Sequence, residues 1–203
     1  MADFTRLNVA RSELILGGQK SGKSRRAEAL AQSWLARSDA HRAVLIATAQ
    51  AGDDEMRLRI ARHQGDRAQR LPAMVTLEAP WQLAQAIQTH SAPDTLIVVD
   101  CLTLWLTNWL MPVALSSASQ PAGTDTPEPA FEAQKTRLFA VVQSSPGPLV
   151  MVGNEIGLGV IPLGREVRAF VDALGLLNQG VAQNCQRVTL MTAGLPLTLK
   201  DSL

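Results

Sequence analysis

The sequence contains no tyrosine, only two cysteines and almost no excess of charge, and each shortage excludes a class of protein. Cys101 and Cys185 lack the spacing of metal ligands, so we expect two reduced, buried thiols and no disulfide framework. A formal net charge of +1 provides no field of one sign that would attract nucleic acid. We therefore expect no nucleic-acid partner.

Long hydrophobic runs are also missing. No run approaches the roughly 18 apolar residues of a membrane span, and charged residues interrupt the N-terminus where a signal peptide would be apolar. These absences predict a cytoplasmic protein without a membrane span. The 203 residues, 46% of them hydrophobic, are enough for one well-buried domain over residues 1–203, with 1–11 as an N-terminal extension.

Short apolar runs alternate with longer segments of helical periodicity. The runs are continuous rather than alternating, which predicts parallel strands covered on both faces, at 14–16, 43–46, 96–99, 149–152 and 188–191. The helical segments lie at 23–37, 53–64, 81–90, 132–143 and 165–182. This alternation predicts an α/β fold with a mostly parallel, doubly wound sheet and helices on both faces.

Residues 112–129 break the alternation. They are rich in Ser, Thr, Ala and Pro and show no periodicity, which predicts an exposed, mobile loop. A tolerated insertion explains this composition better than a functional lid, because the segment lacks anchoring groups.

A phosphate-binding motif, G-x-x-x-x-G-K-[ST], lies between the first predicted strand and the first predicted helix. Its glycines allow backbone N–H groups to turn toward phosphates, Lys23 adds a positive charge, and Ser24 offers a hydroxyl ligand to Mg²⁺. A glycine-rich turn that binds nothing is the weaker alternative. We predict a nucleotide site of the P-loop NTPase type formed by Gly17, Gly18, Gln19, Lys20, Ser21, Gly22, Lys23 and Ser24.

Asp100 follows the apolar run at 96–99 and should emerge at the carboxyl end of a central strand, facing the phosphate-binding loop. In this position its carboxylate can hold Mg²⁺ directly or through water. The alternative is a helix N-cap for residues 102–110, because Asp favours that position.

His63 lies in a basic segment with helical periodicity. Met56, Ile60 and His63 share one predicted face, which should turn the imidazole toward the protein body. From the residues alone, a structural histidine or a solvated basic helix is the better interpretation, and a nucleophile that attacks phosphorus is the sharper alternative. Arg59, Arg62 and Arg67 are candidates to stabilise the developing charge, and a solvated charged face is the alternative for them.

The chain resembles a known family, the bifunctional adenosylcobinamide kinases / adenosylcobinamide-phosphate guanylyltransferases. The resemblance covers nearly the whole chain. It rests on ordered blocks of residues: Gly17-Gly18-x-x-Ser21-Gly22-Lys23-Ser24, Ala47-Thr48-Ala49, Asp54-Glu55-Met56, Arg59-Ile60-x-x-His63, Asp100-Cys101-Leu102-Thr103-Leu104-Trp105-Leu106-Thr107-Asn108, Asn154-Glu155-x-Gly157-x-Gly159, Asn178-Gln179 and Ala193-Gly194-Leu195-Pro196.

The resemblance implies two activities on a corrinoid substrate: phosphorylation of adenosylcobinamide, and transfer of GMP from GTP to the resulting phosphate. It implies ATP or GTP with Mg²⁺ in the first step, and a homo-oligomer, typically a trimer. His63 matches the residue that carries GMP covalently, which reverses the preference stated above. The implied contacts of the guanine nucleotide are Ala47, Thr48, Ala49, Gln64, Gly65, Asp66, Arg67, Glu78 and Asp100.

Some positions depart from the family pattern. Lys20 occupies a position where Arg is usual in the family. Lysine keeps the positive charge but cannot form the paired hydrogen bonds that a guanidinium makes to phosphate. A tryptophan that usually precedes the equivalent of Glu78 is absent, so Glu78 is a weaker assignment than His63. Leu163 replaces the customary acid after Pro162, and Glu155 is open to interpretation as a corrinoid contact or a structural turn.

Two other functions stay open at this point. A simple small-molecule kinase would use the phosphate-binding loop but leave His63 without covalent chemistry. A nucleotide-sensing module would bind GTP or ATP without forming a product.

Overall fold

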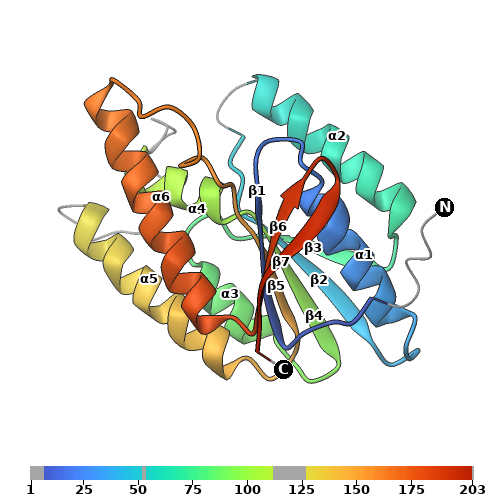
Figure 1. Ribbon diagram of the computed structural model, residues 1–203. Helices are drawn as coiled ribbons and strands as arrows, with labels where there is room; N and C mark the ends of the chain where they lie inside the picture. The colour runs from blue at the N-terminus through green and yellow to red at the C-terminus, as the bar shows by residue number, and fades with distance from the viewer. Residues whose placement is uncertain (1–6, 52–53, 112–126, 203) are drawn as a thin grey trace.

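One seven-stranded sheet runs through the computed structural model, which describes residues 7–51, 54–111 and 127–202 (Figure 1). Within these ranges the side chains of residues 59, 63, 66, 68 and 127–129 lie outside the description. The order across the sheet is β3-β2-β4-β5-β1-β6-β7, and every neighbouring pair is parallel except β6 and β7. The strands are β1 (Ser12–Gly17), β2 (Arg42–Ala47), β3 (Met74–Glu78), β4 (Thr95–Asp100), β5 (Leu149–Val152), β6 (Arg187–Thr192) and β7 (Leu195–Asp201).

Helices cover both faces of this sheet, which confirms the predicted α/β fold with a mostly parallel, doubly wound sheet (Figure 1). One face carries α1 (Lys23–Leu35) and α2 (Asp54–Arg70). The other carries α3 (Leu83–His90), α4 (Leu102–Leu110), α5 (Pro127–Ser144) and α6 (Arg165–Asn184). Among the described residues, no helix is long and apolar enough to cross a membrane.

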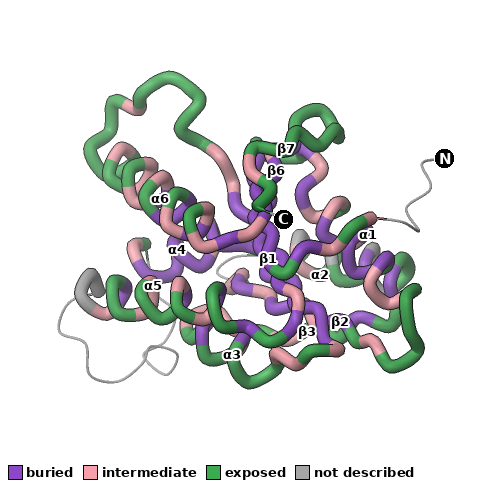
Figure 2. Tube along the Cα trace, turned by 60° about the horizontal axis from the view of Figure 1, so that its bottom comes forward, coloured by how far each residue is buried: buried purple, intermediate pink, exposed green. Residues whose placement is uncertain are grey.

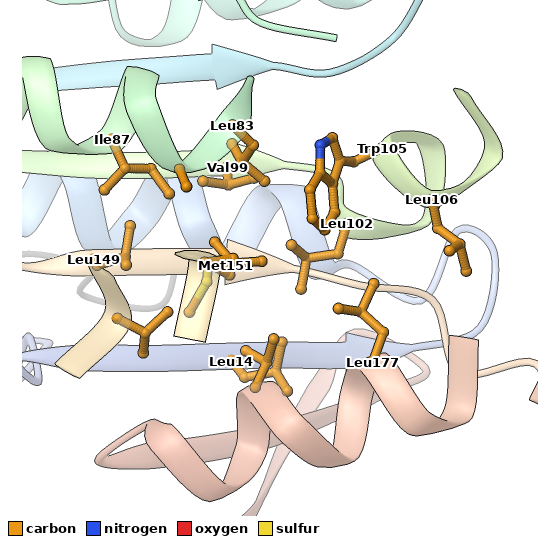
Figure 3. Close-up of a cluster of buried hydrophobic side chains, with 14 of the residues drawn as sticks. Leu14, Leu83, Ile87, Val99, Leu102, Trp105, Leu106, Leu149, Met151 and Leu177 are labelled. Atoms are coloured by element: carbon orange, nitrogen blue, oxygen red, sulfur yellow. The ribbon is translucent and has the colours of Figure 1, made fainter. Parts of the chain in front are cut away.

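The central strands are buried because their apolar side chains project from both faces of the sheet and pack against the helices that cover those faces. Figure 2 shows these strands as buried and the outer sides of the helices as exposed. The larger core cluster lies between the sheet and α3 to α6, with Trp105 fully buried in it (Figure 3). Its indole N–H donates to the carbonyl of Trp81 at 2.9 Å, so the ring is both packed and hydrogen-bonded.

All five predicted strands are present, and the structure has two further strands, β3 and β7, that the sequence did not predict. β3 and β7 are edge strands with mostly exposed side chains, so neither has the continuous apolar run on which the prediction relied. β7 is also antiparallel to β6, to which it is joined by a tight turn at Ala193 and Gly194, where φ is +52° and +81°.

The predicted helices are present with different ends. α2 continues six residues beyond the predicted end at residue 64, so the segment after His63 is helical. α5 begins at Pro127, so the prediction of a loop up to residue 129 is wrong at its end. Proline is well accommodated in the first turn of a helix, where its missing N–H has no partner to lose. The rest of the predicted loop, residues 112–126, lies outside the described residues.

Both cysteines are free and buried, as predicted. Burial is the main cause that raises the pKa of Cys101 and of Cys185 to about 12. Both thiols are therefore protonated near neutral pH and do not act as nucleophiles.

A buried carboxylate joins β1 to its neighbours beneath the phosphate-binding loop. Glu13 accepts from Arg26 Nε of α1 at 2.9 Å and from the hydroxyl of Thr189 on β6 at 2.8 Å. Its second oxygen lies 3.6 Å from Arg187 Nη1, and Arg187 also pairs with Asp201 of β7 at 2.9 Å. This cluster fixes α1, which begins in the phosphate-binding loop, to three strands.

Replacing Glu13 with Gln should lower the free energy of unfolding by about 3 kcal/mol, because the buried Arg187 and the half-buried Arg26 lose their shared anion. Urea unfolding measures this change. Glu132→Gln is a matched control: Glu132 pairs with Lys135 at the surface, where its side chain is 55% exposed, and its loss should cost less than about 0.5 kcal/mol. Equal, small losses in both variants would contradict a structural role for Glu13.

Candidate active site

The predicted phosphate-binding loop joins β1 to α1 and has the backbone conformation that its glycines allow. Gly17 has φ +151° and Gly22, the N-cap of α1, has φ +101°. A side chain at Gly17 would not fit, because a Cβ atom there would lie 2.5 Å from the carbonyl oxygen of Met191. The loop therefore combines glycine conformations with the start of α1, two features from which anion sites are built.

Lys23 lies under this loop and is buried, with its ammonium donating to the carbonyl of Gly18 at 2.6 Å. Burial lowers the pKa of Lys23, and the nearby Cys101 and Asp100 act in the opposite direction. A buried ammonium with one short bond to the loop is well placed to exchange that bond for a phosphate oxygen.

Ser24 and Asp100 meet as the sequence predicted for a metal site. The Ser24 hydroxyl donates to Asp100 Oδ2 at 3.0 Å, which brings the first turn of α1 to the end of β4. The alternative role of Asp100 as a helix N-cap is wrong, because Cys101 occupies the N-cap position of α4 and no side chain caps it.

The donors at this position suit Mg²⁺. A hydroxyl and a carboxylate supply oxygen, which Mg²⁺ prefers, and its remaining positions are usually taken by phosphate and water. Across the described ranges, no cluster of three or more His, Cys, Asp or Glu side chains forms a protein-only metal site. The residues present therefore fit a magnesium ion that arrives with a nucleotide.

The sheet register aligns three of the predicted nucleotide contacts. Ala47 at the end of β2 is paired with Glu78 of β3 on one side and with Asp100 of β4 on the other. Neighbouring strands lie about 4.8 Å apart, so two strand spacings, about 10 Å, separate the backbones of Glu78 and Asp100. Glu78 is exposed, and Ala49 is half-buried.

Thr48 is fully buried, and its polar atoms all bond within the protein. The hydroxyl donates to the carbonyl of Cys101 at 2.7 Å and accepts from the Cys101 N–H at 2.9 Å. The Thr48 N–H reaches the carbonyl of Asp100 at 3.3 Å, and the Thr48 carbonyl accepts from Asn108 at 2.8 Å. Thr48 therefore holds the backbone on both sides of the Asp100–Cys101 bond.

Helix α4 links three loops at this end of the sheet through polar side chains. Asn108 donates to the carbonyls of Thr48 and Pro80, at 2.8 and 2.9 Å. Thr103 accepts from the N–H of Asn154, after β5, at 2.8 Å. From the sequence we assign no role to Thr103 or Asn108. Polar residues in the otherwise apolar segment 102–110 do indicate buried hydrogen bonds, because buried polar groups need partners.

The turn between β6 and β7 contacts the phosphate-binding loop, which the sequence did not predict. The N–H of Gly194 donates to the carbonyl of Ser21 at 3.0 Å, and a Cβ atom at Gly22 would lie 3.3 Å from Gly194 Cα. The hydroxyl of Ser21 is buried and has no hydrogen-bond partner within the described part of the chain. Gln19 and Lys20 are exposed.

His63 lies in helix α2, but its side chain lies outside the described part of the structure. The same holds for the side chains of Arg59 and Asp66. After the histidine, Gln64 and Gly65 are exposed, as is Arg62 before it.

Arg67, in contrast, is buried against α1, with its Nε 3.9 Å from Glu28 Oε1. Arg70 reaches the same carboxylate at 3.1 Å. The last turns of α2 are thus attached to the helix that begins in the phosphate-binding loop.

Residues 13–199 match the family described as cobinamide kinase / cobinamide phosphate guanyltransferase (CobU). The chain is 44% identical over 189 residues to the bifunctional adenosylcobalamin biosynthesis protein CobP of Pseudomonas aeruginosa, covering 93% of this chain and 96% of the relative. It is 36% identical to the bifunctional protein CobU of Salmonella typhimurium and 33% identical to that of Escherichia coli, each over 92% of this chain and 98% of the relative.

Replacing Thr48 with Val should leave the buried N–H of Cys101 without its partner, while the Cys101 carbonyl keeps only its bond from the Trp105 N–H, at 3.1 Å. We expect a loss of about 2 kcal/mol in unfolding free energy and a several-fold rise in the Mg²⁺ concentration that supports half-maximal nucleotide binding. Urea unfolding and titration of a fluorescent GTP analogue measure the two effects.

Thr48→Ser keeps the hydroxyl and should restore the Mg²⁺ dependence. Thr107→Val is the matched control, because among the described residues the Thr107 hydroxyl bonds only the carbonyl of Thr103 within α4, at 2.9 Å. Normal Mg²⁺ dependence in Thr48→Val would show that Thr48 does not position Asp100.

Proposed function

Because this chain belongs to the cobinamide kinase / cobinamide phosphate guanyltransferase family, we propose that it carries out two phosphorus transfers on one corrinoid. It first phosphorylates the aminopropanol hydroxyl of adenosylcobinamide with ATP or GTP. It then transfers GMP from GTP to the new phosphate, giving adenosyl-GDP-cobinamide. The observation that carries this proposal is the family match over residues 13–199, which spans the phosphate-binding loop, Asp100 and α2. A cytoplasmic location stays a prediction.

The phosphate-binding loop binds the triphosphate in both reactions. Its N–H groups and the start of α1 orient the phosphates, and Lys23 places a positive charge against them. Ser24 and Asp100, already 3.0 Å apart, are the residues that would hold Mg²⁺. When bound, Mg²⁺ neutralises charge on the phosphates.

In the GMP transfer, His63 is the nucleophile. Its imidazole nitrogen attacks the α-phosphorus of GTP, a nitrogen–phosphorus bond forms, and the bond to the leaving pyrophosphate breaks. An oxygen of the corrinoid phosphate then attacks the same phosphorus and releases His63. We propose that the guanine nucleotide lies against Ala47, Ala49, the segment 64–67, Glu78 and Asp100, with Thr48 supporting its neighbours.

Incubation with GTP labelled at the α-phosphate should attach one labelled GMP to each chain. The label should be acid-labile and alkali-stable, as a phosphoramidate is, and it should be absent from His63→Ala. His90→Ala is the matched control, because His90 is an exposed residue at the end of α3, and it should be labelled like the wild type.

The wild type tests the alternatives in the same experiment, with adenosylcobinamide present and products followed by mass spectrometry. Corrinoid phosphate without protein label or GDP-linked product would favour a simple kinase. Nucleotide binding with no product at all would favour a sensing module. Either outcome would contradict the bifunctional assignment.

We further propose that the chain forms a homo-oligomer, a trimer by family resemblance. The support is an exposed apolar face on β7, where Leu195, Leu197 and Leu199 are 71%, 58% and 55% exposed. A strand at the edge of a sheet with leucines on its surface is a natural contact between copies of a chain.

Light scattering should give three times the chain mass of 21.8 kDa for the wild type. Leu197→Glu should lower the mass toward that of one chain, because it places a charge in the contact. Val75→Glu is the control: Val75 is 59% exposed on the opposite edge strand, β3. A wild-type mass of 21.8 kDa would contradict the oligomer.

A further inference from the structure

Strand β5 lies between the two strands that carry the phosphate-binding loop and Asp100. Val152, its last residue, is paired with Ile15 of β1 on one side and with Asp100 of β4 on the other. All three strands are parallel, so the residues after Val152 emerge at the edge where the loop and Asp100 lie. These residues are Gly153, Asn154 and Glu155.

The backbone of this segment is held from three directions. Toward β1, the N–H groups of Gly153 and Glu155 donate to the carbonyls of Ile15 and Gly17, at 3.0 and 3.1 Å. The Asn154 N–H donates to Thr103 of α4 at 2.8 Å. The Asn154 carbonyl accepts from the buried Asn178 of α6 at 3.0 Å.

These bonds continue the parallel ladder past the end of the strand and place Glu155 level with the first glycine of the phosphate-binding loop. A position fixed by several neighbours is what a reacting group needs, because little reorganisation is left for the moment of reaction.

The Glu155 carboxylate is available at this position. It is half-buried, it accepts one hydrogen bond from the Gly157 N–H at 2.9 Å, and it enters no ion pair among the described residues. The two other carboxylates that close strands at this edge are differently placed: Asp100 holds Ser24, and Glu78 lies on β3, with three strands between it and β1. Residues 156–161 are exposed, so a bulky acceptor can approach Glu155 from solvent.

We propose that Glu155 is the proton acceptor of the kinase reaction, an inference that rests on the proposed function. The acceptor hydroxyl oxygen of the corrinoid attacks the γ-phosphorus, and a new oxygen–phosphorus bond forms as the bond to the β-phosphate oxygen breaks. The hydroxyl proton moves to the Glu155 carboxylate, and the nucleoside diphosphate leaves. Water then takes the proton from Glu155. In the GMP transfer the acceptor is a phosphate oxygen without a proton, so Glu155 has no part in it.

The test compares the two half-reactions in one variant. Glu155→Gln should lower kcat for phosphorylation of adenosylcobinamide by about 100-fold or more, with KM for the corrinoid changed by less than about threefold, since an amide keeps the shape but cannot take a proton. The same preparation should transfer GMP to supplied adenosylcobinamide phosphate, and label His63, within about twofold of wild type. Intact GMP transfer also shows that the variant is folded. Glu166→Gln, an exposed glutamate in the first turn of α6, is the matched control and should keep both activities.

Each other outcome would overturn the inference in a recognisable way. A kinase kcat within threefold of wild type would show that Glu155 takes no proton. An equal loss of both activities would assign Glu155 to the support of the shared phosphate-binding loop. A wild-type chain with neither activity would instead overturn the proposed function, and this role with it.

Discussion

The hydrogen bond from the Ser24 hydroxyl to Asp100 joins two residues that are 76 positions apart in the sequence. Its existence depends on the sheet, because β1 and β4 are parallel, lie on either side of β5 and end at the same edge. Each end of the bond is also held separately. The pair between Arg26 and Glu13 fixes α1 on the Ser24 side, and Thr48 fixes the chain next to Asp100. A metal-bound nucleotide needs both oxygens in place, so these supports serve one geometry.

Both supports, the Arg26–Glu13 pair and Thr48, place polar groups in the protein interior. Burying a polar group costs free energy unless it has a hydrogen-bond or ion-pair partner. Glu13 meets this requirement with two arginines and a threonine, although its second oxygen has no hydrogen bond within the described residues and relies on Arg187 at 3.6 Å. Helix α4 also pairs its buried polar groups, because its apolar and polar side chains have different partners. Trp105 is packed in the core, while Thr103 and Asn108 satisfy the backbone of three loops. Apolar packing alone would stabilise the layers without fixing where the loops lie relative to each other.

The sequence was sufficient for the parts of the fold that depend on continuous burial. The five central strands and the phosphate-binding loop follow from apolar runs and from a motif whose chemistry is local. β3 and β7 were missed because an edge strand is exposed on one side, and its exposed residues carry no continuous apolar signal. The meeting of Ser24 and Asp100 was predictable because parallel strands share an edge. The roles of Thr48 and Gly194 were not, because they depend on which backbone groups of distant segments come within 3 Å, and no local pattern encodes that.

The order of the strands also bears on how one phosphate-binding loop can serve two reactions. In the proposed kinase reaction the attack is at the γ-phosphorus of one nucleotide, and in the proposed GMP transfer it is at the α-phosphorus of a separate GTP. The two attacking groups therefore approach different phosphates of the triphosphate that the loop holds in each reaction. The residues that we propose for the two reactions, the proton acceptor Glu155 and the nucleophile His63, lie on different elements. Glu155 extends the central sheet beside Gly17, and His63 lies on α2, whose last turns are attached to α1 through Arg67, Arg70 and Glu28. In the proposed function, separate support of the two reacting groups is what allows one phosphate-binding loop to serve both transfers.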